Sequence, residues 1–353
     1  PGGNNLTGRC PEGGISITGG SLIMNSLKKF IKSTAGMVFI VTVLVGIAVH
    51  IATGNFFTSY NISTLSRAAS FAIIVGFGQT IVLLTGGIDL SVATVGQVCG
   101  MASAIFMVNY GMNPYLAIII ASLMGIVLGA VNGFFIAYFK MTPFIVTLAT
   151  MQIYKGIVYV ITKGMPITGM PENAQNLANG IIGGVLPKIV VMMILICVIL
   201  TVMLNRTKFG RHIYALGGNR KCAKIVGIPT EKIEMLVYCL SGLLAAFAGV
   251  MMACKLASFQ ASIGESWQMD SITAAVLGGT SMAGGIGTVV GTIFGGLLSS
   301  VISTCITLLR ISSYWQTIVT GAVVLIAVLI DAVKDNPAIQ EKIQRKRRSK
   351  GKN

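Results

Sequence analysis

Only a few polar side chains interrupt the long apolar segments of this sequence, and these are the residues that could do chemistry there. One of them is the acidic residue Asp89, in the stretch 85–91 (TGGIDLS) between two apolar segments. A carboxylate inside a bilayer costs on the order of 3 kcal/mol unless water, a helix N-terminus or a cation compensates it. Asp89 therefore either caps the helix that follows it, through its first-turn amides, or contacts a solute directly.

Uncharged amides and hydroxyls are more frequent than charges within the apolar segments. Such side chains either hydrogen-bond between helices or line a path for a hydroxylated solute. The candidate translocation path consists of Asp89, Gln97, Asn132, Thr147 and Gln152. Lys155 either lines this path or extends to the membrane interface. Few charges and many amides suit a neutral polyol better than an ion.

The motifs of catalytic and nucleotide-binding sites are missing from the sequence. There is no G-x-x-x-x-G-K-[ST] phosphate loop, and the glycine-rich stretch 278–285 lacks the lysine that would reach a phosphate. The only histidines, His50 and His212, form no H-E-x-x-H motif. We expect no catalytic residue, no metal site, no cofactor and no hydrolysis of ATP by this chain itself.

The elements that carry these residues are predicted to be membrane helices. The chain is 54% hydrophobic and only 10% charged, whereas an ordinary soluble domain has about 25% charged residues. This predicts an all-α integral membrane protein with about ten transmembrane helices. The apolar segments are 34–53, 68–85, 91–109, 114–138, 143–162, 188–204, 233–255, 270–284, 288–309 and 315–333. The eighth is too short to span comfortably and ends in glycines, which predicts a broken or re-entrant helix near 278–287.

The distribution of basic residues predicts the orientation of the chain. The loop 205–232 and the tail are rich in Lys and Arg, so both are expected in the cytoplasm, as are the N and C termini. The basic residues behind the net charge of +16 are then expected to interact with lipid headgroups, and not with nucleic acid. The predicted divisions are a disordered lead-in or non-native extension (1–23), a basic cytoplasmic N-terminus (24–33), a transmembrane domain (34–333) that contains the cytoplasmic loop 205–232, and a basic cytoplasmic tail (334–353).

Two glycine series predict tight helix packing. Glycines four residues apart form a groove along one helix face, into which a neighbouring helix can fit. The series are Gly125, Gly129 and Gly133 in the fourth segment, and Gly287, Gly291 and Gly295 around the ninth.

The loop 205–232 contains the signals of a short helix. Gly217-Gly218-Asn219 predicts a turn, Asn219 can cap a helix over 220–226, and Gly227 can end it. A short, partly apolar helix between two membrane spans is either a docking element for another protein or a basic segment that lies on anionic lipid.

Four stretches of the chain resemble one known family. They are 85–91 (TGGIDLS), 143–148 (PFIVTL), 210–228 (GRHIYALGGNRKCAKIVGI) and 270–291 (DSITAAVLGGTSMAGGIGTVVG). In this order and combination they resemble the permease subunits of bacterial ABC importers for ribose and related monosaccharides. An ABC permease for a nucleoside or a furanone-type signal, and an ion-coupled secondary transporter, remain as alternatives.

The resemblance implies partners and a site. It implies a bacterial inner-membrane protein that pairs with a second permease copy, with a sugar-type ABC ATPase beneath and an extracytoplasmic solute-binding protein outside. Glu265 and Asp270 are candidate contacts for the binding protein. The residues implied to couple to the ATPase are Gly210, Arg211, Gly217, Gly218, Asn219, Arg220, Lys221, Ala223, Lys224 and Gly227.

Overall fold

The computed structural model describes residues 34–184, 186–312 and 314–335, and these are almost entirely helical. The predicted segments 1–23 and 24–33 lie outside the described residues, as does the tail 334–353 apart from its first two residues.

A helix lies in each of the ten predicted apolar segments. These helices are α2 (Thr34–Thr53), α3 (Ser59–Leu84), α4 (Val92–Val108), α5 (Pro114–Ala137), α6 (Pro143–Thr162), α8 (Lys188–Arg206), α11 (Thr230–Leu256), α12 (Trp267–Leu277), α13 (Val289–Leu308) and α14 (Tyr314–Asp335). Seven helices of the described part are long and apolar enough to cross a bilayer, and α4 is a shorter apolar helix. The chain is therefore an all-α membrane protein, as predicted.

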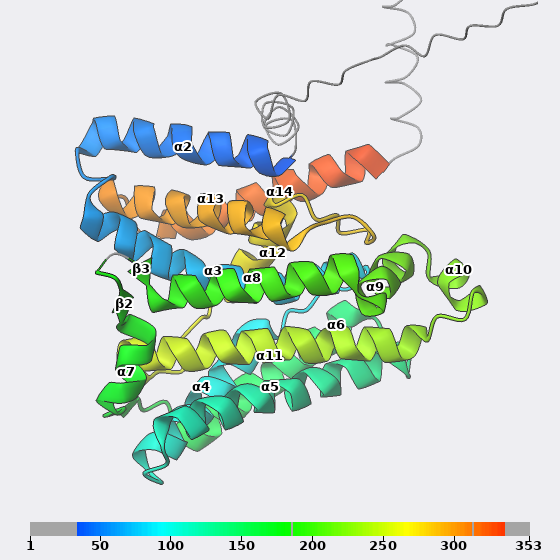
Figure 1. Cartoon of the computed structure of the whole chain (residues 1–353), viewed down its shortest axis with the longest axis horizontal. Coiled ribbons are helices and arrows are strands. Elements are labelled where there is room, and N and C mark those ends of the chain that lie inside the picture. Colours follow the sequence, from blue (N-terminus) through cyan, green and yellow to red (C-terminus); the bar gives the residue numbers. More distant parts are fainter. Residues whose placement is uncertain (1–33, 185, 313, 336–353) are drawn as a thin grey trace, which may run out of the picture.

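The remaining elements lie at the ends of the long helices. α7 (Glu172–Asn179) and the two-residue strands β2 (Ile181–Ile182) and β3 (Leu186–Pro187) lie at one end of the molecule in Figure 1. α9 (Lys208–Gly218) and α10 (Arg220–Ile225) lie at the other end. A second short ladder pairs β1 (Ile167–Thr168) with β4 (Ser258–Phe259). These ladders fasten loops and add no sheet to the helical core.

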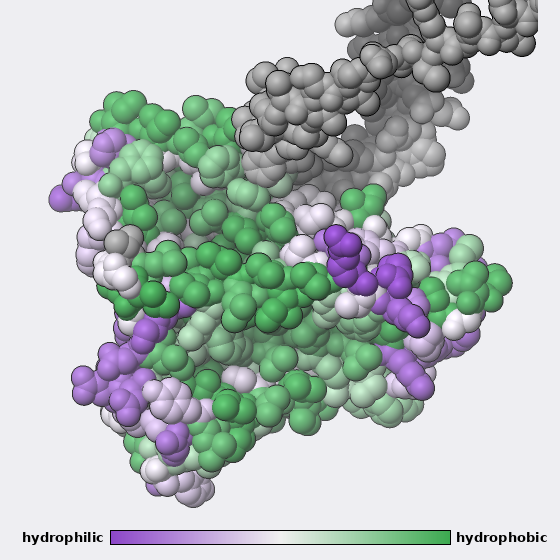
Figure 2. Space-filling view, in the orientation of Figure 1, coloured by the Kyte–Doolittle hydropathy of each residue, from purple (hydrophilic) through white to green (hydrophobic). Residues whose placement is uncertain are grey.

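The surface shows where lipid meets the protein. Figure 2 shows hydrophobic residues over the broad flank of the molecule and hydrophilic residues gathered at its two ends. On α8, the side chains of Leu195, Val198 and Ile199 are all more than half exposed. Such a continuous apolar surface is unfavourable in water and favourable in a hydrocarbon layer. The flank therefore faces the membrane.

α3 and α11 form the centre of the fold. In their most apolar windows 83% of the residues of α3 and 67% of those of α11 are buried, against 17% for α2. Figure 1 shows α11 between α8 and α5, with α3 nearer to α2 and α13. Mutations in α3 or α11 should therefore disturb packing more than mutations in α2.

Glycine lets α5 approach the backbone of α11 directly. A Cβ on Gly125 would overlap the carbonyl oxygen of Gly242, and a Cβ on Gly129 would overlap that of Tyr238. A Cβ on Gly133 would come within 2.8 Å of the Cα of Met235. The first predicted glycine series thus lies along the α5–α11 contact.

The second glycine series lies against α12 and the segment after it. Side chains on Gly291 and Gly295 would overlap the carbonyl oxygens of Gly278 and Ala274. Gly287 precedes α13, and a Cβ there would meet Thr280. α12 has only 11 residues, and the chain from 278 to 288 is non-helical. The helix interruption expected near 278–287 is present.

Candidate coupling and translocation site

Four stretches that are far apart in the sequence meet at the break between α3 and α4. The amide of Gly285 donates a hydrogen bond of 2.9 Å to the carbonyl oxygen of Leu84. A Cβ on Gly217, near the end of α9, would overlap the same carbonyl oxygen. The hydroxyl of Thr147 in α6 lies 3.4 Å from the carbonyl oxygen of Ile88. The stretches that meet are 85–91, 143–148, 210–228 and 270–291.

α9 and α10 make up most of the loop 205–232. Asn219 accepts a hydrogen bond from the amide of Cys222 at 3.0 Å and thereby caps α10. Gly227 follows the end of α10 with a φ of +83°, which favours glycine. The helix predicted over 220–226 is confirmed, and it is one residue shorter than expected.

The predicted turn at Gly217-Gly218-Asn219 is wrong in its first two residues. Both glycines are helical and end α9, and only Asn219 has extended backbone, with φ −160° and ψ 103°. The reason is a close backbone contact. Gly217 touches the end of α3, and a Cβ on Gly285 would come within 3.0 Å of the Cα of Gly218. Gly217 allows α9 to approach two other segments, whereas a Cβ on Gly218 would meet no described atom within 4 Å. Neither glycine reverses the chain.

A tyrosine adds a second link between α9 and the segment 278–288. The hydroxyl of Tyr214 donates a hydrogen bond of 2.9 Å to the carbonyl oxygen of Gly287. Burial raises the pKa of Tyr214 above its ordinary value, so the hydroxyl stays protonated and able to donate. Tyr214 therefore links α9 directly to the segment before α13.

The corner between α8 and α9 is closed by a small residue. A Cβ on Gly210 would overlap the backbone of Leu204, and the hydroxyl of Thr207 caps α9 by accepting from the amide of Gly210 at 3.2 Å. Arg211 is exposed, and its guanidinium lies 3.5 Å from the carbonyl oxygen of Arg206. Gly210 is thus a packing residue, whereas Arg211 is free to meet a partner.

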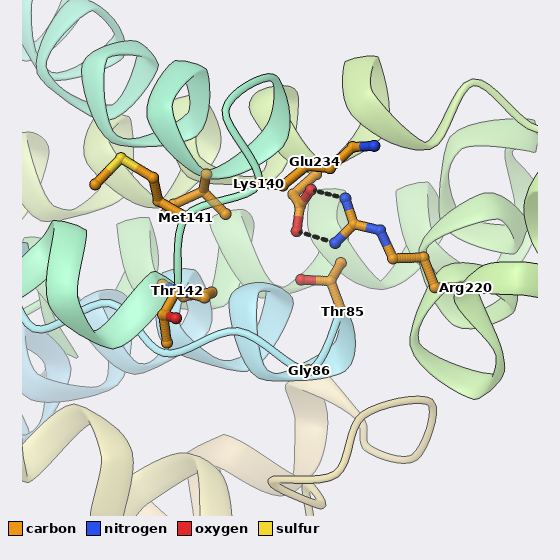
Figure 3. Close-up of a pocket in the computed structure, with 9 residues that line it drawn as sticks. Thr85, Gly86, Lys140, Met141, Thr142, Arg220 and Glu234 are labelled. Carbon is orange, nitrogen blue, oxygen red and sulfur yellow. Dashed lines mark hydrogen bonds and ion pairs between the residues drawn. The ribbon is translucent and has the colours of Figure 1, made fainter.

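An ion pair fastens α10 to α11. One guanidinium nitrogen of Arg220 lies 2.9 Å from a carboxylate oxygen of Glu234, and the second donates to the other oxygen (Figure 3). The side chain of Glu234 is 5% exposed and that of Arg220 is 47% exposed. A two-bond guanidinium–carboxylate contact fixes orientation as well as distance. α10 is therefore held firmly on the membrane helix that follows it.

The same ion pair lies beside a cavity of about 370 Å³. Figure 3 shows that its other walls come from the α3–α4 break and from the turn between α5 and α6. The lining residues are Thr85, Gly86, Ile136, Lys140, Met141, Thr142, Pro143, Arg220 and Glu234. The cavity therefore opens at the α9–α10 end of the molecule, next to the four-stretch junction.

Asp89 lies at the centre of a buried hydrogen-bond network and is 1% exposed. One carboxylate oxygen accepts from the amide of Ser91 at 2.9 Å and from its hydroxyl at 2.7 Å. The other accepts from the hydroxyl of Ser241 in α11 at 3.0 Å. The side-chain amide of Asn132 in α5 donates to the Ser91 hydroxyl at 2.7 Å. The network joins three helices at the point where α4 begins.

Asp89 was expected either to cap the helix that follows it or to contact a solute, and the structure shows no capping of the first turn by its side chain. Asp89 bonds to Ser91, the N-cap residue of α4, and no side-chain cap hydrogen bond reaches the first-turn amides. It therefore orders the entry to the helix without capping it as expected. Its polar partners Ser91 and Ser241 gave no signal in the sequence, because each is a common small residue in an apolar segment.

The other candidate path residues are spread over the fold. Gln97 is buried, and its amide donates to the carbonyl oxygen of Ile263 at 3.0 Å. Thr147 is buried at the α6 junction, and Gln152 is exposed on α6. The structure thus brings Asp89 and Asn132 together and places Thr147 beside Ile88, the residue before Asp89. No hydrogen bond joins Gln97 or Gln152 to them in the described part of the chain.

Replacing Asp89 tests what the network does. Asp89→Leu leaves three buried donors on Ser91 and Ser241 without an acceptor, and each such loss costs about 1–3 kcal/mol. Asp89→Asn keeps an oxygen for Ser91 and should cost less than half as much. Thermal unfolding of the purified protein in detergent measures both. Equal melting temperatures for the two variants would contradict the network. Uptake lost in Asp89→Asn at unchanged stability would indicate direct solute contact.

Lys155, Glu265 and Asp270 are charged candidates that lie far from α10. The ammonium of Lys155 lies 3.0 Å from a carboxylate oxygen of Glu265, and both side chains are substantially exposed. Lys155 thus pairs with an acidic loop residue, and neither of the roles expected for it included this ion pair. Asp270 lies in the first turn of α12 and is half-buried.

α10 presents an apolar and basic surface to its surroundings. Ile225 is 83% exposed and Val226 is 74% exposed, and Lys221 is exposed beside them. Lys224 pairs with Glu231 at 3.1 Å but remains largely exposed. Ala223 instead packs inward. Large apolar side chains at an exposed helix end, with cations around them, are typical of a protein contact.

Comparison with known proteins identifies the family of this chain. The model of the family described as "Branched-chain amino acid transport system / permease component" matches residues 61–328. The chain belongs to this permease family. No solved structure matches it.

Several curated relatives of this permease are sugar-import permeases by name. The chain is 43% identical over 292 residues to the ribose import permease protein RbsC of Bacillus subtilis (strain 168), covering 82% of the chain and 89% of the relative. It is 40% identical over 283 residues to RbsC of Escherichia coli (strain K12), covering 79% and 88%. It is 33% identical over 298 residues to the D-allose transport system permease protein AlsC of the same strain, covering 84% and 90%.

Family membership fixes the general role of this permease. The chain is a membrane-embedded transport subunit of an ATP-driven importer and is not itself an enzyme. Importers of this class take their energy from an ATPase subunit and their cargo from a solute-binding protein. The four-stretch junction and α10 are therefore parts of a transport subunit.

Proposed function

We propose that this permease carries ribose or a chemically similar monosaccharide into a bacterial cell. The named cargoes of its relatives include ribose, galactose and allose, which share neutral polyhydroxyl chemistry. The described helices offer such a solute amides and hydroxyls and very few charges. An ion-coupled transporter would need several buried ionisable groups as ion sites, which makes it the weaker alternative.

The coupling mechanism is supported by one observation: α10 is exposed and is joined to α11 by an ion pair. We propose that Ile225 and Val226 enter a cleft on the ATPase, and that Lys221 and Lys224 meet acidic groups around it. Gly217, Arg211 and Gly227 then serve the shape and surface of the same contact. The Arg220–Glu234 ion pair is a rigid link between α10 and α11. Through it, a force applied to α10 by the ATPase would reach a membrane helix.

The proposed mechanism is alternating access. Closure of the ATPase on ATP would push α10, and the push would pass to α11 through Arg220. It would pass to α3 and to the segment 278–288 through Gly217 and Tyr214, which touch both. The two states need to differ by only a few kcal/mol for ATP to shift their populations. Hydrolysis would reset the permease.

We further propose how this permease is assembled and what it contacts. Two copies would form the pore, with α10 of each on the cytoplasmic side, and basic residues near α9 would meet anionic lipid. Glu265, which is exposed at the opposite end, is the proposed contact for the solute-binding protein. Gln97, Asn132, Thr147 and Gln152 remain proposed members of the path.

The test is sugar uptake by reconstituted vesicles. Labelled ribose should enter only when the permease, its ATPase, the binding protein and ATP are all present. Ile225→Asp with Val226→Asp should remove the ATPase from the purified complex, because exposed apolar anchors at an interface contribute about 2 kcal/mol or more each. Ile181→Asp with Ile182→Asp is the matched control, since both residues are 49% exposed at the other end of the molecule.

Three outcomes would contradict the proposal. Uptake driven by a proton or sodium gradient without the ATPase would favour the secondary transporter. Uptake of a nucleoside in preference to ribose would favour the alternative cargo. An ATPase that stays bound to the Ile225 and Val226 variant would exclude α10 as its docking element.

A further inference from the structure

A second cavity lies at the end of the molecule far from α10. Its volume is about 180 Å³, and it is enclosed by α3, α11, α12, α13 and α14. α11 has 27 residues and so is about 40 Å long at about 1.5 Å per residue. Lys255, one of the lining residues, stands one residue before the end of α11, whereas the ion pair with α10 is in its second turn. This outer cavity is therefore separated from the α10 end by most of the bilayer thickness.

The outer cavity is lined by hydrogen-bonding groups of both charges. Lys255 supplies a cation and Asp270 an anion, and no ion pair joins them in the described part of the chain. Four hydroxyls from one face of α13 and an amide from α14 complete the polar lining. The uncharged polar residues are Ser299, Ser300, Ser303, Thr304 and Gln316. The cavity thus contains donors, acceptors and groups that can act as either.

Aromatic packing holds the ammonium group of Lys255 in place. The rings of Phe71 and Trp267 are nearly parallel, with an interplanar angle of 7° and centroids 6.5 Å apart. The ammonium of Lys255 lies 5.3 Å from the centroid of the Phe71 ring, within cation–π range. Phe71 and Trp267 are almost fully buried, so they form a rigid wall and do not present open faces. A preorganised polar cavity needs little reordering to bind a ligand.

We infer that the outer cavity is a subsite for a neutral monosaccharide on its way into the permease. Sugar hydroxyls both donate and accept, and so match a lysine, a carboxylate and a row of hydroxyls at the same time. The opposite charges of Lys255 and Asp270, the two charged residues that line the cavity, cancel, and Arg67 adds a cation near Lys255 outside the lining. An anionic lipid headgroup would be attracted by Lys255 but repelled by Asp270, so the neutral ligand fits better. This inference rests on the proposed function, since it assumes that the cargo is a sugar.

Filling the cavity tests the subsite in the assembled transporter. Ser303→Phe should lower labelled ribose uptake about tenfold or more, because the new ring occupies the space of the sugar. Thr307→Phe is the matched control, one turn along α13 with an exposed side chain outside the cavity. Lys255→Met and Asp270→Asn should each lower uptake about tenfold, the effect of losing a charged hydrogen bond. Stimulation of the ATPase by the binding protein should remain in the Ser303→Phe, Thr307→Phe and Lys255→Met variants.

A labelling experiment keeps the test independent of folding and of transport rate. Ser303→Cys should react with a membrane-impermeant thiol reagent applied from outside. Ribose delivered by the binding protein should slow that reaction severalfold. A reaction rate that follows the anionic lipid content of the vesicles and ignores the sugar would overturn the inference in favour of a lipid site.

The failures of the two proposals are distinguishable. A wild-type complex that imports no ribose contradicts the proposed function, and labelling is then repeated with a panel of monosaccharides. If none of them slows it, the subsite is excluded as well. A wild-type complex that imports ribose, together with Ser303→Phe and Asp270→Asn variants of full activity, overturns the subsite alone.

Discussion

Arg220→Ala is expected to uncouple sugar uptake from ATP hydrolysis and to destabilise the permease. The change leaves the carboxylate of Glu234 buried without its cation, because that side chain is only 5% exposed. Removing one partner of a buried charge pair costs about 2–5 kcal/mol, and the half-exposed guanidinium places this case toward the lower end. Uptake should fall more than about tenfold, because α10 is no longer fastened to α11.

Two further variants separate coupling from stability. Arg206→Ala is the control, since Arg206 is an exposed arginine at the end of α8 and no side-chain interaction of it is seen among the described residues. Arg220→Met with Glu234→Leu replaces the ion pair by an apolar contact of similar size, which is often neutral for stability. This double variant should recover both the melting temperature and most of the uptake. Normal uptake by Arg220→Ala would exclude the ion pair as a coupling link.

Gly129→Ala is expected to prevent stable folding, although it adds a single methyl group. That methyl would overlap the carbonyl oxygen of Tyr238 and come within 3.1 Å of the Cα of Cys239. Both obstacles are backbone, so α5 and α11 would have to separate. The cost should exceed about 3 kcal/mol, the upper part of the range for overpacked sites. The measurements are expression level and melting temperature in detergent.

Gly156→Ala is the matched control for this prediction. Gly156 also lies inside a membrane helix, α6, but a Cβ there meets no atom of the described chain within 4 Å. Alanine is favoured over glycine in a helix by about 1 kcal/mol, so this variant should be as stable as the wild type or slightly more so. Equal effects at Gly129 and Gly156 would mean that helix propensity, and not close packing, decides the outcome.

Hydropathy predicted which segments are helical but not where each helix begins. The second apolar segment was expected from 68, yet α3 begins at Ser59, capped by the hydroxyl of Thr58. The first turns of α3 contain polar residues, which a hydrophobic window does not register, although backbone hydrogen bonding continues through them. For the same reason the polar helix α7 was not predicted.

The polar contacts were harder to predict than the helices. Asp89 and Asn132 were identified because a polar residue in an apolar segment is unusual. Ser241 was not, because nothing in its own segment links it to a residue 152 positions earlier in the chain. The loop charge of Arg220 was noted, but its partner Glu234 lies at the margin of a predicted span. Pairing across helices depends on packing, which the sequence pattern does not contain.

Because α11 is one continuous helix, a small movement at its α10 end could produce a larger displacement at its other end. This one helix contacts α10 through Glu234, the buried Asp89 through Ser241 and the outer cavity through Lys255. It is unbroken from Thr230 to Leu256 and contains no proline, so it can tilt as a single lever arm. A tilt of about 5° about one end displaces the other end by about 3 Å over a length of about 40 Å. A displacement that size would open or shut a passage for one sugar ring, with no helix having to melt.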